Sequence, residues 1–126
     1  KGDILIARTG ATYGKCLFFE DEKPSVFAGY LIKIAFNQRI LPKFFWIFSQ
    51  STNFETQKKQ LVLGGGQHQF NANTLKKLVV PVPSIEEQER IIGEVIVQQE
   101  IVKENLTLLK IFQNKIQNKI SSVWGE

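Results

Sequence analysis

The last third of the chain follows one helical pattern that no proline interrupts. Its predicted start is a capping box, in which Ser84 caps the first turn and Glu87 reaches back to it. About 40 helical residues at ~1.5 Å each extend roughly 60 Å, which is more than a domain built from the remaining residues could cover. A good part of this helix must therefore pair with another helix. Its apolar residues recur in heptads, and the predicted seam is Ile92, Val95, Gln99, Val102, Leu106, Leu109, Gln113, Ile116, Ile120 and Val123.

The sequence before this helix has shorter periods that are typical of strands. Apolar runs at residues 3–8 and 15–19 flank a glycine-rich turn, which predicts two strands joined by a loop. A longer run at residues 25–36, rich in apolar and β-branched side chains, predicts a central strand buried on both faces. Residues 77–82 predict a further short strand, which Pro81 and Pro83 would end.

Two helices are predicted between these strands. Pro42 suits the first position of a helix, and the aromatic residues around Trp46 follow at helical spacing. That spacing favours core packing over a platform for stacked bases. A second helix is predicted from Thr52, because Thr52 and Glu55 form a capping box. The glycines at residues 64–66 would end it.

The predicted fold class is α+β, with a mixed domain at residues 1–80 and one long coiled-coil helix at residues 81–126. The formal net charge is +4, and it is unevenly distributed between these two parts. The first part carries eleven Lys and Arg against five Asp and Glu, and the second part carries five against seven. A basic domain beside a mildly acidic helix favours a polyanionic partner for the domain and a protein partner for the helix. A chance imbalance in a small domain is the alternative.

Compartment signals are few. No apolar run approaches the length that crosses a bilayer and no signal peptide is recognisable, so we expect no membrane partner. The lone Cys16 cannot form an internal disulfide, which fits a reducing cytoplasm, and a buried, inert thiol is favoured over a nucleophile. The sequence has no Met and opens with Lys1 in mid-pattern, so we interpret it as a segment of a longer protein.

The stretch RTGATYGK at residues 8–15 is close to a phosphate-binding loop of the form G-x-x-x-x-G-K-[ST]. Its spacing from Gly10 to Gly14 is one residue short, and Cys16 stands where that loop needs a magnesium-binding hydroxyl. The residues that follow do not resemble the helix that such a loop opens into. His68 is the sole histidine, which excludes a metal site built on a pair of histidines. With no nucleophile or methyl-transfer motif present, we expect no catalytic residue, metal or cofactor.

Two polar clusters offer the chemistry of DNA recognition instead. Cations neutralise phosphates, hydroxyls bond to them, and glycines let the backbone approach closely; the alternative for such a cluster is a plain tight turn. Amides can pair bidentately with adenine; the alternative is a polar loop with a helix cap, such as Asn73. The first cluster is Arg8, Thr9, Thr12, Tyr13 and Lys15, and the second is Gln67, His68, Gln69, Asn71 and Asn73.

Four stretches together resemble one known family. They are KGDILIARTGATYGK, the G-Q-x-x-x-N segment, LKKLVVPVPSIEEQERI and the long helix. In order and spacing they resemble the target-recognition domain and conserved spacer helix of type I restriction–modification specificity subunits. The resemblance implies a mixed α/β recognition domain and a spacer helix that packs antiparallel on its equivalent. A full subunit has two of each, so residues 1–80 would be the C-terminal part of one recognition domain and residues 81–126 one spacer helix. Such a chain would read one half of a bipartite DNA site. The usual P-x-P-P appears here as PVPS at residues 81–84.

The resemblance also implies partners. These are double-stranded DNA, separate methyltransferase and restriction subunits, and a second spacer helix that pairs in cis or by homodimerisation. Two alternatives stay open. The chain could be the recognition segment of a single-chain restriction–methylation enzyme whose catalysis lies upstream, which the preceding sequence would decide. It could also be a coiled-coil assembly module without DNA binding of its own, which a DNA-binding measurement would decide.

Overall fold

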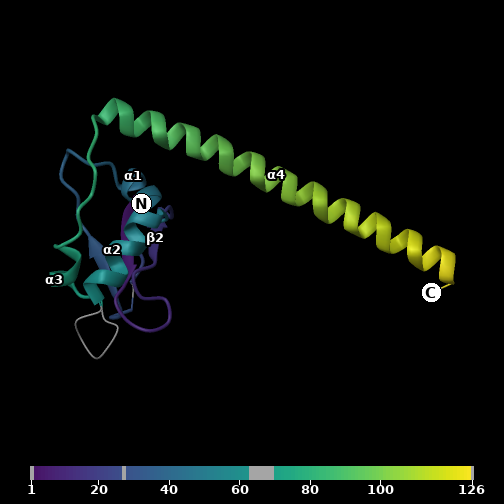
Figure 1. The fold of residues 1–126 in the computed structure, drawn as a ribbon, viewed down its shortest axis with the longest axis horizontal. Coiled ribbons are helices and arrows are strands. Elements are labelled where there is room, and N and C mark those ends of the chain that lie inside the picture. The colour runs from purple at the N-terminus through teal and green to yellow at the C-terminus, as the bar shows by residue number, and fades with distance from the viewer. Residues whose placement is uncertain (1, 27, 63–69, 126) are drawn as a thin grey trace. The chain divides into compact units, whose positions relative to one another are not determined.

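The computed structural model describes residues 2–26, 28–62 and 70–125. Contacts within the chain divide it into unit 1, Lys1–Ile92, and unit 2, Gly93–Glu126. None of the helices in the described ranges is long and apolar enough to cross a membrane. The predicted α+β class is confirmed, and the elements shown in Figure 1 are β1 (Asp3–Ala7), β2 (Cys16–Phe19), β3 (Leu31–Ile34), α1 (Pro42–Phe48), α2 (Thr52–Val62), α3 (Ala72–Leu75) and α4 (Ile85–Trp124).

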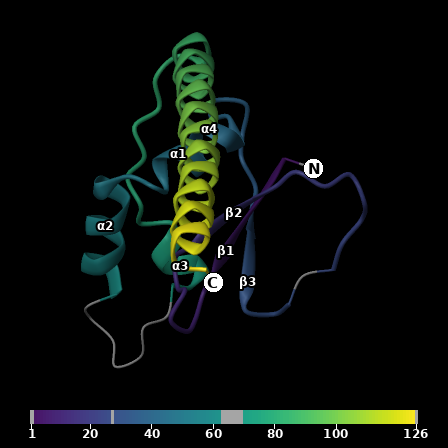
Figure 2. The same ribbon diagram turned by 90° about the vertical axis from the view of Figure 1, so that its right-hand side faces the viewer.

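The three strands form an antiparallel sheet in the order β2-β1-β3, visible in Figure 2. The predicted pair of strands around the glycine-rich turn is confirmed as β1 and β2, with Ile6 opposite Cys16. Strand β1 lies in the middle of the sheet, and its residues from Ile4 to Ala7 are all buried. Successive side chains of a strand point to opposite faces, and Ile4 and Ile6 share the face that packs with the phenylalanines of the core.

The prediction of a long central strand at residues 25–36 is wrong. Strand β3 covers only Leu31–Ile34 and lies at an edge of the sheet. A turn precedes it, in which the Leu31 amide donates to the Ala28 carbonyl at 3.0 Å. Val26 is fully exposed and Lys33 is exposed as well. The apolar run is therefore shared between an exposed loop and a short edge strand, while β1 takes the buried central place.

The core of unit 1 is mainly aromatic. Phe45 and Phe48 of α1 meet Phe54 of α2 edge to face, with ring centroids 6.3 Å and 5.9 Å apart, an arrangement that aromatic pairs favour. Phe54 and Phe70 have less than 2% of their surface exposed and pack with the buried isoleucines of β1. The prediction that the aromatic cluster is core is therefore confirmed.

The starts of α1 and α2 were both predicted from local signals in the sequence, and one of these signals is confirmed. Pro42 is the first residue of α1, as predicted. The capping box predicted at Thr52 is wrong, because the Ser51 hydroxyl accepts from the Phe54 amide at 3.2 Å and so caps α2. The Glu55 carboxylate pairs with Lys58 at 2.6 Å instead of reaching back to the start of the helix. The glycines at residues 64–66 lie outside the described residues.

The segment between α3 and α4 is irregular, so the strand predicted at residues 77–82 is wrong. A side chain replaces the missing strand partner. The Gln57 amide group on α2 donates to the Val79 carbonyl at 2.9 Å and accepts from the Val79 amide at 2.9 Å. Pro81 and Pro83 have no N–H to donate, which prevents a regular ladder here.

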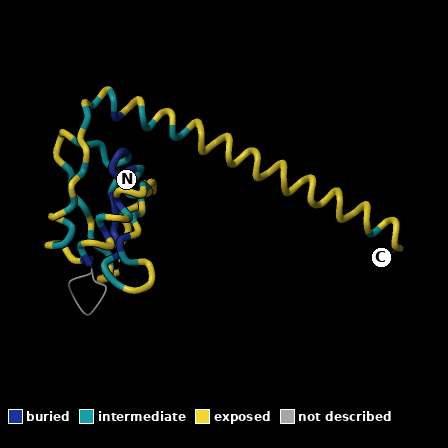
Figure 3. Tube along the Cα trace, in the orientation of Figure 1, coloured by how far each residue is buried: buried dark blue, intermediate teal, exposed yellow. Residues whose placement is uncertain are grey.

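Helix α4 confirms the long helix predicted from the heptads. The Ser84 hydroxyl accepts from the Glu87 amide at 3.2 Å, as a capping residue does. The other half of the predicted box is wrong, because the Glu87 carboxylate bonds to Arg90, which lowers the pKa of Glu87. Most of α4 beyond its first turns is exposed, as Figure 3 shows.

Gln88, in the first turns of α4, is fully buried in unit 1. Its amide donates to the carbonyls of Arg39 and Pro83, both at 2.9 Å, and accepts from the Leu41 amide at 2.8 Å. Leu41 is the N-cap residue of α1 and makes no side-chain cap of its own. Gln88 therefore ties the start of α4 to the start of α1 across 47 residues of sequence.

Candidate nucleic-acid interface

The loop between β1 and β2, residues 8–15, is closed by its own backbone. The Gly14 amide donates to the Ala7 carbonyl at 2.7 Å, and the Ala7 amide donates to the Lys15 carbonyl at 3.0 Å. Two backbone bonds between residues three positions apart, from the Tyr13 amide to the Gly10 carbonyl and from the Lys15 amide to the Thr12 carbonyl, turn the chain within the loop. Gly10 and Gly14 have φ of +80° and +75°, the left-handed conformation that glycine adopts without strain. The glycines of RTGATYGK thus serve the turn itself.

The loop contains all five residues of the first predicted cluster, and two of them are exposed. Thr12 and Lys15 are exposed, and Thr9 and Tyr13 are half-buried. Arg8 is half-buried too, and its Nε is buried without a hydrogen-bond partner among the described residues. A buried donor without a hydrogen-bond partner is uncommon in native structures.

The loop packs against Lys58 of α2, a residue that was not predicted from the sequence. Lys58 is 8% exposed, and its ammonium lies 5.1 Å from the centre of the Tyr13 ring. A Cβ placed on Gly14 would come within 2.2 Å of Cδ of Lys58, so the lysine stem occupies the space beside that glycine. The sequence offers one sign of this burial, because Lys58 lies four residues after Phe54 and four before Val62, on the apolar face of the helix.

The second predicted cluster is only partly described. Gln67, His68 and Gln69 lie outside the described residues. The next residue, Phe70, is fully buried, and its amide donates to the Arg8 carbonyl at 2.7 Å. Phe70 therefore lies directly beside the loop at residues 8–15.

The two asparagines of this cluster are both exposed. Asn71 is the N-cap of α3, and its Oδ1 accepts from the amide and the hydroxyl of Thr74, at 2.9 Å and 3.1 Å. The capping residue is thus Asn71 and not Asn73, which lies within α3. With Oδ1 engaged, Asn71 has its amide donors left, whereas bidentate pairing with adenine needs an acceptor as well.

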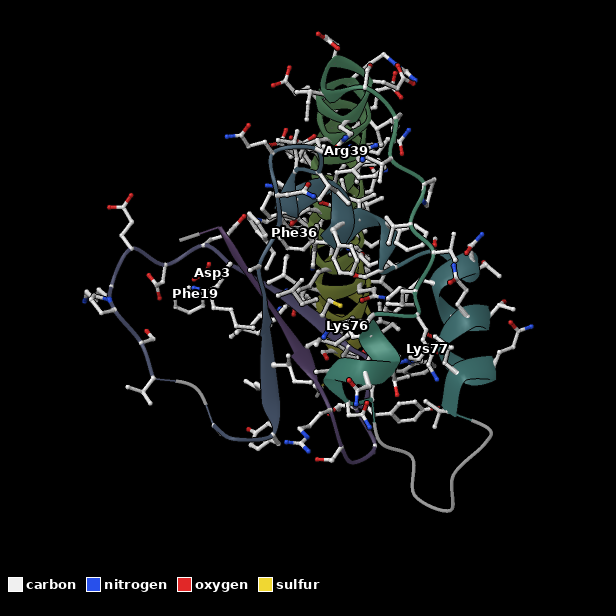
Figure 4. The ribbon with its side chains drawn as sticks, turned by 90° about the vertical axis from the view of Figure 1, so that its left-hand side faces the viewer. Asp3, Phe19, Phe36, Arg39, Lys76 and Lys77 are labelled. Carbon is white, nitrogen blue, oxygen red and sulfur yellow. The ribbon has the colours of Figure 1, made fainter. Side chains whose placement is uncertain are left out.

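Opposite charges lie at the two ends of the β1–β2 hairpin. The strands are antiparallel with Asp3 opposite Phe19, both labelled in Figure 4. Asp3 and the acidic residues 20–22 are therefore at one end of the hairpin, and the loop at residues 8–15 is at the other. The end of α2 and the short α3 lie at the loop end in both Figure 1 and Figure 2.

The lysines at the two ends of the hairpin differ in whether they form ion pairs. Near the acidic end, Lys33 pairs with Asp3 at 2.9 Å, and Lys43 lies 3.5 Å from Glu20. Lys15 in the loop and Lys76 and Lys77 at the end of α3 are exposed, and the latter two are labelled in Figure 4. Across the described ranges, these three form no ion pair with another side chain. The loop end therefore offers uncompensated positive charge.

The chemistry of a phosphate-binding loop or a reactive thiol is absent from this turn. Cys16 opens strand β2 and not a helix, so the turn does not lead into the helix that a phosphate-binding loop requires. Burial raises the pKa of Cys16 to about 11, although a hydrogen bond with Ser49 and the charge of Lys58 oppose the shift. Its thiol stays protonated near neutral pH, which is unsuited to a nucleophile. Where the chain is described, no three His, Cys, Asp or Glu side chains gather as a metal site would require.

The predicted seam on α4 is largely open to solvent. Its first apolar residues, Ile92 and Val95, are half-buried. The six that follow are between 42% and 64% exposed. Ile101 lies off the seam and is 51% exposed, so apolar exposure is not confined to one stripe. The exposed seam residues are Val102, Leu106, Leu109, Ile116, Ile120 and Val123.

Comparison with known proteins identifies the family. No curated protein and no solved structure matched the chain. The family model described as the type I restriction modification DNA specificity domain matches residues 1–122, which is nearly the whole of the 126 residues. The match covers the loop at residues 8–15, the basic end of the hairpin and all but the last two residues of α4. The chain belongs to the family of type I restriction–modification DNA specificity domains.

Proposed function

We propose that this chain reads one half of a bipartite DNA sequence within the specificity subunit of a type I restriction–modification complex. Its family recognises DNA sequences and is a non-catalytic targeting module. Residues 1–80 would form the recognition part and residues 81–126 the spacer helix. The methyltransferase and restriction activities would belong to partner subunits that this chain directs to their site.

The uncompensated positive charge at the loop end of unit 1 carries this proposal. Lys15, Lys76 and Lys77 are exposed without ion pairs to other described residues, whereas Lys33 and Lys43 are paired with acids. DNA phosphates attract unpaired cations, and most of the binding free energy of such contacts comes from counterion release. The geometry therefore supports DNA at the loop end of the hairpin rather than at its acidic end.

Within this end we assign two roles. Arg8, Thr12 and Lys15 would hold the phosphate backbone, because cations and hydroxyls bind a uniform anionic chain. The amide cluster at residues 67–73, with Gln67, His68 and Gln69 outside the described residues, would reach base edges. For Asn71 the cap on α3 narrows the role to donation, for example to N7 or O6 of guanine.

The seam of α4 would pair with a second spacer helix, either from the same polypeptide or from a second copy of this chain. Six exposed apolar residues in heptad register support the pairing, since water-exposed seams of this length are stabilised by a partner. Glu100 and Glu104 precede the cluster Lys110, Lys115 and Lys119. An antiparallel partner would bring the acidic part of one helix to the basic part of the other.

The salt dependence of DNA binding tests the proposal. Lys15→Ala, in the complex assembled with its methyltransferase subunit, should weaken binding to all sequences and reduce the slope of log affinity against log salt by ~1. Lys23→Ala is the matched control, because Lys23 is exposed in the loop after the acidic residues 20–22. An unchanged slope in Lys15→Ala, or an equal change in both variants, would refute the placement of DNA at the loop.

Base readout needs a separate measurement. Gln69→Ala should leave the salt slope unchanged, cost about 1–3 kcal/mol on the cognate site and relax preference at one base pair. Methylation mapping of DNA modified by the intact complex identifies the cognate site beforehand. If Gln69→Ala lowered affinity for all sequences alike, the assignment of the amide cluster to base edges would be wrong. If the complex bound no DNA through this chain, the assembly-module alternative would stand.

A further inference from the structure

We propose that Lys58 is a positioning residue for DNA recognition, which holds the loop at residues 8–15 in shape without touching DNA. The inference rests on the proposed function, because it concerns the same loop. It adds a residue outside both polar clusters, on a different element, and assigns it a role that a count of basic residues would miss.

The burial of Lys58 separates it from the other cations of this surface. It is 8% exposed, whereas Lys59, Lys76 and Lys77 are exposed. Its ammonium is 2.6 Å from a Glu55 oxygen, so its charge is compensated within α2. A buried and compensated ammonium releases no counterion to a phosphate. Lys58 therefore differs in kind from Lys15.

Lys58 contacts the loop in two ways. Its stem fills the space beside Gly14, where a Cβ would meet Cδ at 2.2 Å and Cγ at 3.1 Å. Its ammonium lies 5.1 Å from the Tyr13 ring centre, within the range of a cation–π interaction. Tyr13 and Gly14 stand between Thr12 and Lys15, the two exposed residues that we assign to phosphates. A shift of Lys58 would move the backbone that presents both.

The charge of Lys58 indicates a role beyond packing, because an apolar side chain would be at least as stable in this buried position beside Gly14. Burying an ammonium costs desolvation energy, and replacing a buried ion pair with apolar residues is often neutral or stabilising. Packing alone would therefore be served by methionine at this position. The ammonium adds a directed contact to the Tyr13 ring, while Glu55, one turn earlier on α2, orients the ammonium.

The first test removes the ammonium and keeps the stem. Lys58→Met, in the intact complex with its methyltransferase subunit, should weaken DNA binding about tenfold, the order of a buried cation–π contact, with the salt slope unchanged. Lys59→Met is the matched control, because it makes the same charge change one residue away on an exposed position. In Lys59→Met any loss of affinity should come with a lower slope. A slope reduced by ~1 in Lys58→Met would mean a direct phosphate contact and would overturn the proposal.

A second variant has an expected sign opposite to simple electrostatics. Glu55→Gln removes one negative charge, so long-range attraction alone would strengthen DNA binding. If Glu55 orients Lys58, binding should instead weaken severalfold at constant slope. The side chain of Glu55 is 47% exposed, so this variant keeps the test available should Lys58→Met fail to fold. Stronger binding by Glu55→Gln would overturn the proposal.

A readout without DNA separates this inference from the proposed function. The backbone amide resonances of Thr12, Tyr13 and Gly14 should shift in Lys58→Met and stay in place in Lys59→Met. If Lys15→Ala left the salt slope unchanged while these resonances shifted, the DNA placement would fail and the positioning role would hold. If the resonances stayed in place in Lys58→Met, the positioning role would fail whatever the DNA result.

Discussion

Gln88→Ala removes a buried amide that joins the starts of two helices, and we expect it to destabilise unit 1 by about 3 kcal/mol. The three hydrogen bonds of Gln88, at 2.8–2.9 Å, contribute roughly 0.5–1.5 kcal/mol each in net terms. Alanine also leaves the Leu41 amide and two carbonyls without their partner. Since α1 has no side-chain cap of its own, its first turn loses its anchor.

Urea unfolding followed by circular dichroism measures this effect. At a denaturant dependence of about 2 kcal/mol per molar urea, the midpoint should fall by roughly 1.5 M. All samples need the same protein concentration, because self-association raises apparent stability. Gln98→Ala is the matched control, since Gln98 is exposed in the same helix and alanine is a slightly better helix former. A loss below about 1 kcal/mol would show that water replaces the bonds of Gln88 and would refute this account.

Three further predictions address the loop, the thiol and the seam. Gly10→Ala should cost about 1–2 kcal/mol for its left-handed backbone, and Gly14→Ala should cost clearly more because its Cβ would also meet Lys58; equal losses in thermal unfolding would contradict the packing of that lysine. With a pKa of about 11 against an ordinary 9.0, Cys16 should react with iodoacetamide at pH 8 about 100-fold more slowly in the folded chain than in urea. Similar alkylation rates in the folded chain and in urea would rule out the burial of Cys16. The neutral thiol also stabilises the fold fully below pH 9, and this contribution is lost as the pH rises to about 11. Leu106→Asp with Leu109→Asp should give monomers in sedimentation experiments at concentrations where the unmodified chain associates, whereas Ile101→Asp, off the seam, should not; association that survives the double change would exclude the seam as the interface.

Elements with strong local signals were predicted well. The glycine-rich turn predicted the β1–β2 hairpin, Pro42 predicted the start of α1, and heptads without proline predicted α4. The edge strand β3 and the irregular residues 77–82 were predicted wrongly. An apolar run indicates that its side chains avoid water, but it does not indicate which layer covers them. The run at residues 25–36 therefore did not show that β1, and not β3, lies in the centre of the sheet.

The candidate site shows the same limit at the level of single residues. The types of residue in RTGATYGK predicted an exposed, glycine-turned loop with cations, and the structure describes such a loop. The burial of Lys58 beside this loop and of Gln88 at the start of α4 was not predicted, because lysine and glutamine are mostly exposed in helices. Their burial depends on contacts with Gly14 and Leu41, which are 44 and 47 positions away in the sequence. Local periodicity places both residues on the apolar faces of their helices, but it does not identify these long-range partners.

The pairing of Gln57 with Val79 has a consequence for hydrogen exchange. Val79 is 73% exposed and lies in an irregular segment, where backbone amides usually exchange with solvent within the dead time of the measurement. Its N–H is nevertheless held by Oε1 of Gln57, and that bond breaks when α2 separates from the segment. The hydrogen-exchange rate of the Val79 amide therefore reports how often α2 opens locally. In Gln57→Ala this amide should exchange at the rate of its unprotected neighbours.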